Sequence, residues 1–184
     1  MLKGDQLTEL SRTVSHALRH EPALYGIALD PEGWVAVADL IPALQTRSRK
    51  WRAVEEADLV RIIETSSKKR FEIVDGQIRA FYGHTQAVTG REPHPAPQAI
   101  LYHGTTPQAA ESIRKAGLLP QRRQYVHLSS NTDTATVVAR RRTGTPVIFT
   151  VDTAAALASG VAFYFGNEDT WMAGPIPAVF LDTL

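Results

Sequence analysis

A proline-rich segment from Val88 to Gln98, VTGREPHPAPQ, constrains the fold of this 184-residue chain more than any other feature. Its three prolines and one glycine interrupt the hydrophobic pattern, so the segment has few side chains to bury. We therefore predict a linker over residues 88–98, a first lobe over residues 1–87 and a second lobe over residues 99–184. Because 43% of the residues are apolar, each lobe can contain a hydrophobic core.

The first lobe begins with an amphipathic pattern. Apolar side chains recur at helical spacing from Leu7 to Leu18, and the helix should end near His20 because Pro22 disfavours helical angles at the preceding residue. The turn at residues 30–33 predicts a strand over residues 34–37, after which Asp39 can cap a second helix. A third helical pattern covers residues 54–63.

The first lobe ends with a hairpin signal, because the pair Asp75-Gly76 separates two candidate strands at residues 70–74 and 78–81. Helices followed by a two-stranded wing indicate a winged-helix lobe, a fold that often binds nucleic acid but does not by itself assign function. In the second lobe, strands are predicted at residues 100–103, 125–128, 146–151, 162–164 and 178–181, with helices at residues 107–115 and 132–141. These helices are too few for a parallel sheet, so the fold class is α+β with a split antiparallel sheet in the second lobe.

Composition excludes several kinds of chemistry. The chain has no cysteine, which excludes disulfides and thiolate metal sites and fits a cytoplasmic protein. No apolar run approaches the roughly 18 residues that a membrane span requires, so no membrane partner is expected. With 20 basic and 19 acidic residues, a nucleic-acid site would require local clustering of basic side chains.

Four basic residues occupy positions from which they could bind a phosphate. Arg19 and His20 lie at the predicted helix end, Arg70 opens the hairpin, and Arg123 precedes a strand. Arginine binds phosphate through paired, charge-assisted hydrogen bonds, and histidine can move a proton near neutral pH. For any single surface arginine, a solvated charge or a weak surface ion pair is the simpler interpretation, and for His20 alone it is a favourable contact with the helix dipole.

Two segments of the second lobe place polar groups at the ends of predicted strands. These segments are YHGTT at residues 102–106 and VHLSS at residues 126–130. A glycine lets a flat ring approach the backbone, and the histidine and hydroxyl side chains can hold a ribose. The sequence lacks the glycine-rich Rossmann and P-loop motifs and the GxSxG and HExxH hydrolase motifs.

Together these segments resemble one family over nearly the whole chain, the NAD-dependent RNA 2'-phosphotransferases. The resemblance is carried, in order, by LSRTVSHALRHEPALYGIALDPEGWVAVADLI, KKRFEI, IRAFYGHT, LYHGTT, RRQYVHLSS and TPVIFTVD. It implies a winged-helix lobe, an ADP-ribosyltransferase-like lobe that binds NAD+, and an active site in the cleft between them. The expected partner is RNA that carries a 2'-phosphate, such as a spliced tRNA, and we expect a monomer.

The resemblance also implies a role for individual residues. The positions that match the family's catalytic set are Arg19, His20, Arg70 and Arg123. The expected NAD+ contacts are His103, Gly104, Thr105, His127, Leu128 and Ser129, with His103 on a ribose and Gly104 beside nicotinamide. Lys68, Arg79 and His84 are expected to face RNA.

The implied reaction consumes NAD+ and needs no metal. The RNA 2'-phosphate attacks the ribose carbon that bears nicotinamide, and the ribose 2''-hydroxyl then attacks the phosphorus. The products are RNA with a free 2'-hydroxyl, ADP-ribose 1'',2''-cyclic phosphate and nicotinamide. Two alternatives stay open: an ADP-ribosyltransferase that caps terminal phosphates of RNA or DNA, and a non-catalytic winged-helix protein that binds nucleic acid.

The chain departs from the family pattern at two places. Tyr82 stands where the family often has glutamine, and Thr143 stands where it often has histidine after an arginine. Because the second change puts a cofactor contact in doubt, Arg142 and Thr143 are left outside the predicted site.

Overall fold

The computed structural model describes residues 2–66, 68–85, 88–89 and 92–184. It divides into two compact units, residues 1–90 and residues 91–184. Residues 90 and 91 of the predicted linker lie outside the described residues, but the two residues before them contact the first unit. Val88 is buried, and the backbone N–H of Thr89 donates to the Pro31 carbonyl at 2.6 Å.

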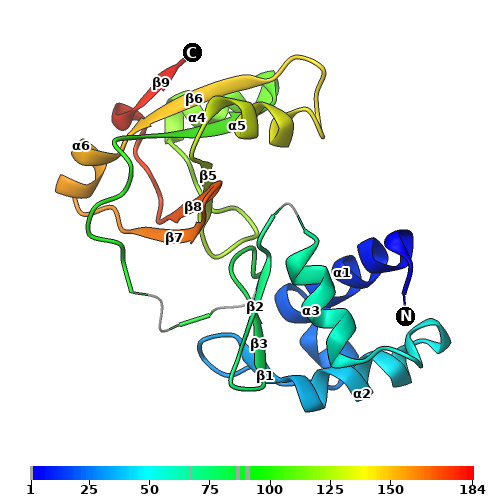
Figure 1. Ribbon diagram of the computed structural model, residues 1–184. Helices are drawn as coiled ribbons and strands as arrows, with labels where there is room; N and C mark the ends of the chain where they lie inside the picture. The colour runs from blue at the N-terminus through cyan, green and yellow to red at the C-terminus, as the bar shows by residue number, and fades with distance from the viewer. Residues whose placement is uncertain (1, 67, 86–87, 90–91) are drawn as a thin grey trace. The chain divides into compact units, whose positions relative to one another are not determined.

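The first unit combines helices with a small antiparallel sheet (Figure 1). Its helices are α1 (Gly4–Arg19), α2 (Val37–Arg47) and α3 (Glu56–Glu64), with short 3-10 turns at Pro22–Tyr25 and Arg49–Trp51. Its strands are β1 (Trp34–Ala36), β2 (Phe71–Val74) and β3 (Gln77–Ala80), in the order β1-β3-β2. The hairpin prediction is confirmed: Asp75 and Gly76 have φ angles of 48° and 72°, as a tight two-residue turn requires.

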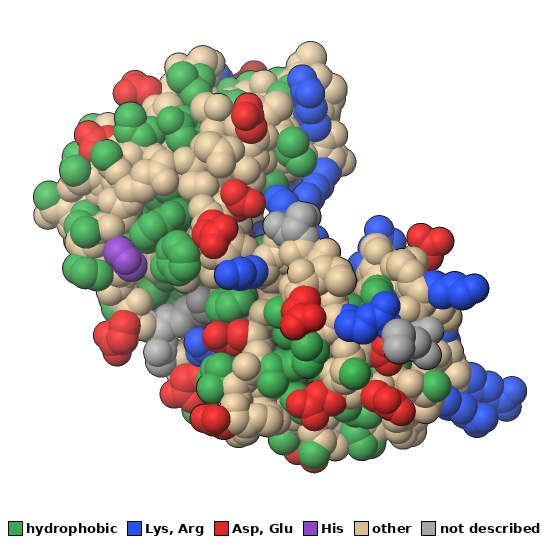
Figure 2. Space-filling model, viewed as in Figure 1, with side chains coloured by type: hydrophobic (Ala, Val, Ile, Leu, Met, Phe, Trp, Pro, Cys, Tyr) green, Lys and Arg blue, Asp and Glu red, His purple; other side chains and the backbone are tan. Residues whose placement is uncertain are grey.

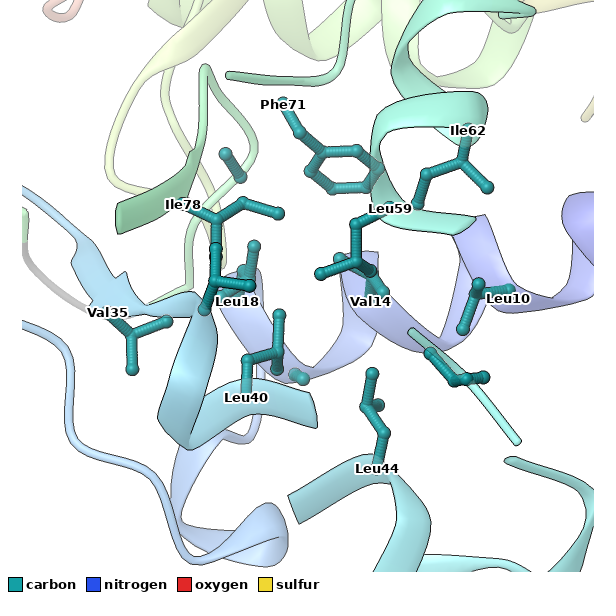
Figure 3. Packing of buried hydrophobic residues seen from close by; sticks show 14 of the residues in the cluster. Leu10, Val14, Leu18, Val35, Leu40, Leu44, Leu59, Ile62, Phe71 and Ile78 are labelled. Carbon is teal, nitrogen blue, oxygen red and sulfur yellow. The ribbon is translucent and has the colours of Figure 1, made fainter. Parts of the chain in front are cut away.

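The core of the first unit forms where the helices meet the hairpin (Figure 3). The apolar face of α1 is fully buried at Leu10, Val14 and Leu18, which confirms the predicted amphipathic helix. Burying one such side chain stabilises the fold by about 1.5–3 kcal/mol. This packing fixes the direction of α1 and therefore the position of its C-terminal end at Arg19 and His20.

Two predictions in the first unit were wrong by a few residues. Val37 was expected in a strand and Asp39 at a helix N-cap, but α2 begins at Val37, so Asp39 lies within its first turn. The reason is a contact with the hairpin, because the backbone N–H of Val37 donates to the Gly76 carbonyl at 2.9 Å. A carboxylate in the first turn still interacts favourably with the helix dipole.

The second unit contains a six-stranded antiparallel sheet, which confirms the predicted antiparallel arrangement. The strands are β4 (Ile100–Thr105), β5 (Val126–Ser129), β6 (Val147–Asp152), β7 (Phe163–Asn167), β8 (Thr170–Ala173) and β9 (Leu181–Thr183), in the order β7-β8-β5-β4-β6-β9. The helices are α4 (Pro107–Ala116), α5 (Thr132–Ala139) and α6 (Thr153–Ala158). In the register of these strands, β4 and β5 are joined at the pair Tyr102–Ser129.

The second unit also departs from prediction in places. Residues 178–181 were expected as a strand, but Ala178–Phe180 forms a 3-10 turn and β9 starts only at Leu181. Pro177 explains the turn, because its φ of −58° suits a turn and its carbonyl accepts from the Phe180 N–H at 3.2 Å. Helix α6 and strand β8 were not predicted. Within the described part of the chain, no helix is both long enough and apolar enough to cross a membrane.

Candidate functional site

The C-terminal end of α1 carries the first two predicted catalytic residues. Arg19 is the last residue of the helix and His20 is its C-cap, where the His20 backbone N–H donates to the His16 carbonyl at 3.0 Å. Both residues are half-buried. The helix ends before Pro22, as predicted. Because both side chains are half-buried, they lie at the border between the core and the solvent.

The segment after β3 connects this helix end to the hairpin. The backbone N–H of Phe81 donates to the Arg70 carbonyl at 3.0 Å, and the backbone N–H of Thr85 donates to the Arg19 carbonyl at 2.9 Å. The Thr85 hydroxyl also donates to the Arg19 carbonyl at 3.2 Å. Residues that are distant in sequence are therefore held together by one short loop, residues 81–85.

Arg19 and Arg70 are in direct contact. Nη2 of Arg19 donates to the Arg70 carbonyl at 3.3 Å, and Nη1 of Arg70 donates to Oγ of Ser66 at 2.6 Å. The Arg19 guanidinium also lies over two rings, with its Cζ 4.9 Å from the Tyr82 centroid and 5.6 Å from the Phe71 centroid. The first unit therefore brings together the cations Arg19 and Arg70, with His20 next to Arg19 in the chain, and the two guanidinium groups suit a phosphate dianion.

The His20 ring has a histidine neighbour that sequence reasoning missed. The His16 and His20 rings have centroids 6.0 Å apart, and Nδ1 of His16 lies 3.2 Å from the Tyr25 hydroxyl. Burial raises the pKa of Tyr25, Arg47 partly opposes that effect, and Glu21 adds to it. The Tyr25 hydroxyl therefore stays protonated at neutral pH. The only sequence signal that places His16 beside His20 is their spacing of four residues on one helix.

The three residues that were expected to face RNA have different surroundings. Arg79 has contacts within the protein, because its Nε donates to Glu72 at 2.6 Å and its guanidinium lies 4.4 Å from the Trp34 centroid. His84 is 5% exposed, and Lys68 is half-buried. A role in RNA binding stays a prediction for each of them, and burial makes a direct contact hardest for His84.

A pocket of about 280 Å³ lies beside the end of α1. Its walls include the apolar side chains of Leu18, Pro22 and Ile27, with Arg19, Asp30 and His84 contributing polar groups. Over the first unit, the face seen in Figure 2 carries interspersed acidic and basic side chains. We therefore expect the positive charge that a phosphate requires to come from the residues at the end of α1 and beside it, Arg19 and Arg70.

In the second unit, His103 is held so that one ring nitrogen can accept a hydrogen bond. Its Nδ1 lies 3.0 Å from the His127 carbonyl, and a carbonyl only accepts, so Nδ1 carries the proton. Burial lowers the pKa of His103, and the bond to the His127 carbonyl opposes this effect. At neutral pH the ring is neutral, and its Nε2 is an acceptor suited to a ribose hydroxyl.

Gly104 is required by the packing of α5. A Cβ at this position would lie 2.1 Å from the Ala135 carbonyl oxygen, which belongs to the backbone of that helix. The close approach that makes glycine necessary is thus between a strand and a helix. The expected contact of Gly104 with nicotinamide stays a prediction. The packing against α5 alone explains why this position is a glycine.

The other expected NAD+ contacts lie on the same two strands. Leu128 and Ser129 are buried in β5, Thr105 ends β4, and Nδ1 of His127 lies 3.1 Å from the Tyr125 carbonyl. The single pair that joins β4 to β5 brings these residues to one region of the sheet.

The fourth predicted catalytic residue, Arg123, lies in the loop before β5 in the second unit. Desolvation lowers the pKa of Arg123, and the nearby positive charge of Arg142 lowers it further. Because the residue as a whole is exposed, its guanidinium remains a cation at neutral pH. Arg142, which was left outside the predicted site, is therefore a close electrostatic neighbour of a predicted site residue.

Comparison with known proteins gives one consistent result. The family model described as RNA 2'-phosphotransferase, Tpt1/KptA family, matches residues 5–174. A probable RNA 2'-phosphotransferase of Acetivibrio thermocellus is 44% identical over 174 residues, which cover 95% of each chain. One from Bacillus thuringiensis subsp. konkukian is 45% identical over 98% of this chain and 97% of the relative. One from Rhizobium rhizogenes is 38% identical over 100% of this chain and 97% of the relative.

Proposed function

Because the chain belongs to the Tpt1/KptA family of RNA 2'-phosphotransferases, we propose that its two units divide the reaction between them. The chain is an enzyme that removes a 2'-phosphate from RNA in an NAD-dependent reaction. In our proposal the first unit binds the RNA 2'-phosphate and the second binds NAD+. The helices and small sheet of the first unit support a winged-helix lobe, and the sheet of the second supports an ADP-ribosyltransferase-like lobe.

The observation that carries this proposal is the contact between Arg19 and Arg70. A 3.3 Å hydrogen bond joins the guanidinium of one to the carbonyl of the other, with His20 next in the chain. Two guanidinium groups held by the same framework can bind the oxygens of one phosphate. Fixed positive groups of this kind stabilise charge that develops in a transition state.

The second unit offers a donor and acceptor set that fits a dinucleotide. NAD+ supplies a ribose carbon activated by a cationic leaving group, nicotinamide. The neutral ring of His103 can accept a hydrogen bond from a ribose hydroxyl through Nε2, and Thr105 and Ser129 supply hydroxyls on the two paired strands β4 and β5. Arg123 adds a positive charge in this unit, and we propose that it acts on the phosphate in the same catalytic set as Arg19, His20 and Arg70.

We propose that the phosphate is transferred in two steps. An oxygen of the RNA 2'-phosphate forms a bond to the activated ribose carbon, and the bond to nicotinamide breaks. The ribose 2''-hydroxyl then attacks the phosphorus, and the RNA 2'-oxygen leaves with a proton. Arg19 and Arg70 hold the phosphate in line and stabilise its oxygens, and His20 assists the proton transfer. The products are RNA with a 2'-hydroxyl, ADP-ribose 1'',2''-cyclic phosphate and nicotinamide.

The test uses a short RNA with one internal 2'-phosphate, incubated with NAD+ and the full chain, with products resolved by mass. The wild-type protein should yield dephosphorylated RNA and ADP-ribose cyclic phosphate. Arg70→Ala should lower the rate about 100-fold or more, whereas Arg52→Ala, a change at an exposed arginine of the same unit, should have little effect. A stable ADP-ribosyl group on the RNA would instead support the capping activity, and unchanged NAD+ would support a binding protein.

A further inference from the structure

We propose that Tyr82 is a positioning residue, whose ring holds the Arg19 guanidinium in the orientation that binds the RNA phosphate. This inference rests on the proposed function of Arg19. The sequence alone assigns no role to Tyr82. In the structure its ring lies against Arg19, a residue of the proposed catalytic set.

The contact has the geometry of a cation–π interaction. The Cζ atom of Arg19 lies 4.9 Å from the centroid of the Tyr82 ring, nearer than the 5.6 Å to the Phe71 centroid. An arginine over an aromatic face is attracted by the ring quadrupole, and the attraction grows as water is excluded. Here the Tyr82 ring is half-buried and Phe71 is buried, so the guanidinium is partly shielded from water.

The orientation of Arg19 is then held by a ring contact and by a hydrogen bond. Tyr82 contacts the planar guanidinium, while Nη2 at its edge donates to the Arg70 carbonyl at 3.3 Å. A free arginine side chain samples many rotamers, and a phosphate contact requires only one of them. Holding that rotamer before RNA arrives reduces the entropy lost on binding.

The backbone on either side of Tyr82 is hydrogen-bonded to Arg19 and Arg70. Phe81, the preceding residue, donates to the Arg70 carbonyl, and Thr85 donates to the Arg19 carbonyl. Between them Gly83 has a φ of +89°, and a Cβ there would lie 3.5 Å from Cδ of Arg19. The loop over residues 81–85 therefore lies close to the Arg19 side chain, and its backbone is hydrogen-bonded to both Arg19 and Arg70.

The experiment compares an aromatic with non-aromatic replacements. Tyr82→Phe keeps the ring face and removes the hydroxyl, whereas Tyr82→Leu and Tyr82→Gln remove the face. Binding of the full chain is measured to an oligonucleotide with one internal 2'-phosphate and to the same oligonucleotide without it, and kcat and KM are measured with NAD+. The Leu and Gln variants should weaken phosphate-dependent binding and raise the KM for RNA about 3- to 30-fold. The KM for NAD+ should not change.

Rescue by the conservative variant separates positioning from a general loss of structure. Tyr82→Phe should bind the phosphorylated oligonucleotide within about 2-fold of wild type, because its ring face is intact. If Tyr82→Leu fails to fold, Tyr82→Gln decides the outcome, because an amide is tolerated at a half-buried position. Loss of binding in the Phe variant equal to that in Leu and Gln would overturn the proposal.

A double-mutant cycle with Arg19→Ala tests whether Tyr82 acts through Arg19. In the Arg19→Ala background, Tyr82→Gln should cause no further loss of phosphate-dependent binding, because the group it positions is absent. Independent, additive losses would overturn the proposal. If wild type shows no turnover but the ring-dependent binding is found, the proposed reaction fails and the role of Tyr82 stands. If wild type turns over and the Leu and Gln variants equal it, only the role of Tyr82 fails.

Discussion

His103, in the second unit, has a pKa that the fold shifts from its ordinary value. Its pKa is lowered by burial from the ordinary 6.5, so the unfolded chain binds this proton more readily than the folded chain. The free energy of unfolding should therefore fall as the pH is lowered below about 6.5, through the folded-state pKa. In the proposed site, NAD+ binding should weaken as the pH falls through the lowered folded-state pKa of His103, because protonation removes the acceptor at Nε2.

Urea denaturation of wild type and of His103→Gln at pH 7.5 and at lower pH would measure this effect. The wild-type protein should lose more stability on acidification than the variant, which cannot titrate at this position. An identical pH dependence of the two proteins would show that His103 does not carry a lowered pKa.

Gly104 yields a prediction about packing alone. Gly104→Ala would place a Cβ 2.1 Å from a backbone oxygen of α5, which cannot rotate away as a side chain could. We expect a loss of about 1–3 kcal/mol or more in the free energy of unfolding. Gly174→Ala is the matched control, because a Cβ there meets nothing within 4 Å. Similar stabilities for the two variants, measured by chemical denaturation, would contradict this account of the strand and helix contact.

For single residues, the sequence predicts the position in a helix or strand more readily than the side chains that the residue contacts. Arg19 and His20 were placed correctly at a helix end, since proline at position 22 is a local signal. The contact of Arg19 with Tyr82 joins segments that only tertiary packing brings together, whereas the contacts of Arg70 with Ser66 and of His16 with Tyr25 depend on how the short chain between them folds. Two of these pairs lie close in sequence, but no local pattern reveals their orientation.

Among the elements, α1 has the greatest influence on the site, because its buried face determines where Arg19 and His20 lie. Leu10 has no exposed surface, and Leu10→Ala should lower the free energy of unfolding by about 2–5 kcal/mol through lost burial and a cavity. Leu24 is 46% exposed, so Leu24→Ala should cost only about 0.5 kcal/mol. Chemical denaturation followed by circular dichroism compares them, and equal losses would contradict the packing described for α1.

Elements with a strong local period were predictable, and those decided by distant contacts were not. The periodic face of α1 and the Asp75-Gly76 turn gave correct predictions. The start of α2 was misplaced because its first N–H is paired with the hairpin, and β9 was misplaced because a turn at Pro177 displaces it. Strand β8 has four residues and little alternation between buried and exposed positions, so its sequence carried no recognisable signal.

For the whole molecule, recognition through a phosphate predicts how RNA binding depends on salt and sequence. Binding of the 2'-phosphorylated RNA should weaken as salt rises, with a slope of about −0.7 on a log–log plot for each phosphate neutralised on a single strand. Changing the bases beside the phosphate should alter affinity little, because phosphate contacts carry no sequence information. Titrations at several salt concentrations with two unrelated sequences test this, and strong sequence preference with weak salt dependence would contradict it.

The boundary placed at the proline-rich segment stays a prediction, and the α+β class could be read from the chain, because its strand signals are short and the helical patterns of the second lobe are few. The arrangement of each site could not. Arg70 and Arg19 are separated by 51 residues, and their contact depends on the loop at residues 81–85, which crosses the end of α1. The family resemblance supplied the grouping that spacing alone could not.

The fate of the phosphorus atom shows whether the RNA 2'-phosphate passes to NAD+. An RNA labelled with radioactive phosphorus only at its internal 2'-phosphate is incubated with the full chain and NAD+, and the labelled products are separated. The label should move onto ADP-ribose as the cyclic phosphate, and no label should move when NAD+ is omitted. Release of the label as inorganic phosphate, or its retention on the RNA while nicotinamide is formed, would contradict the proposed transfer.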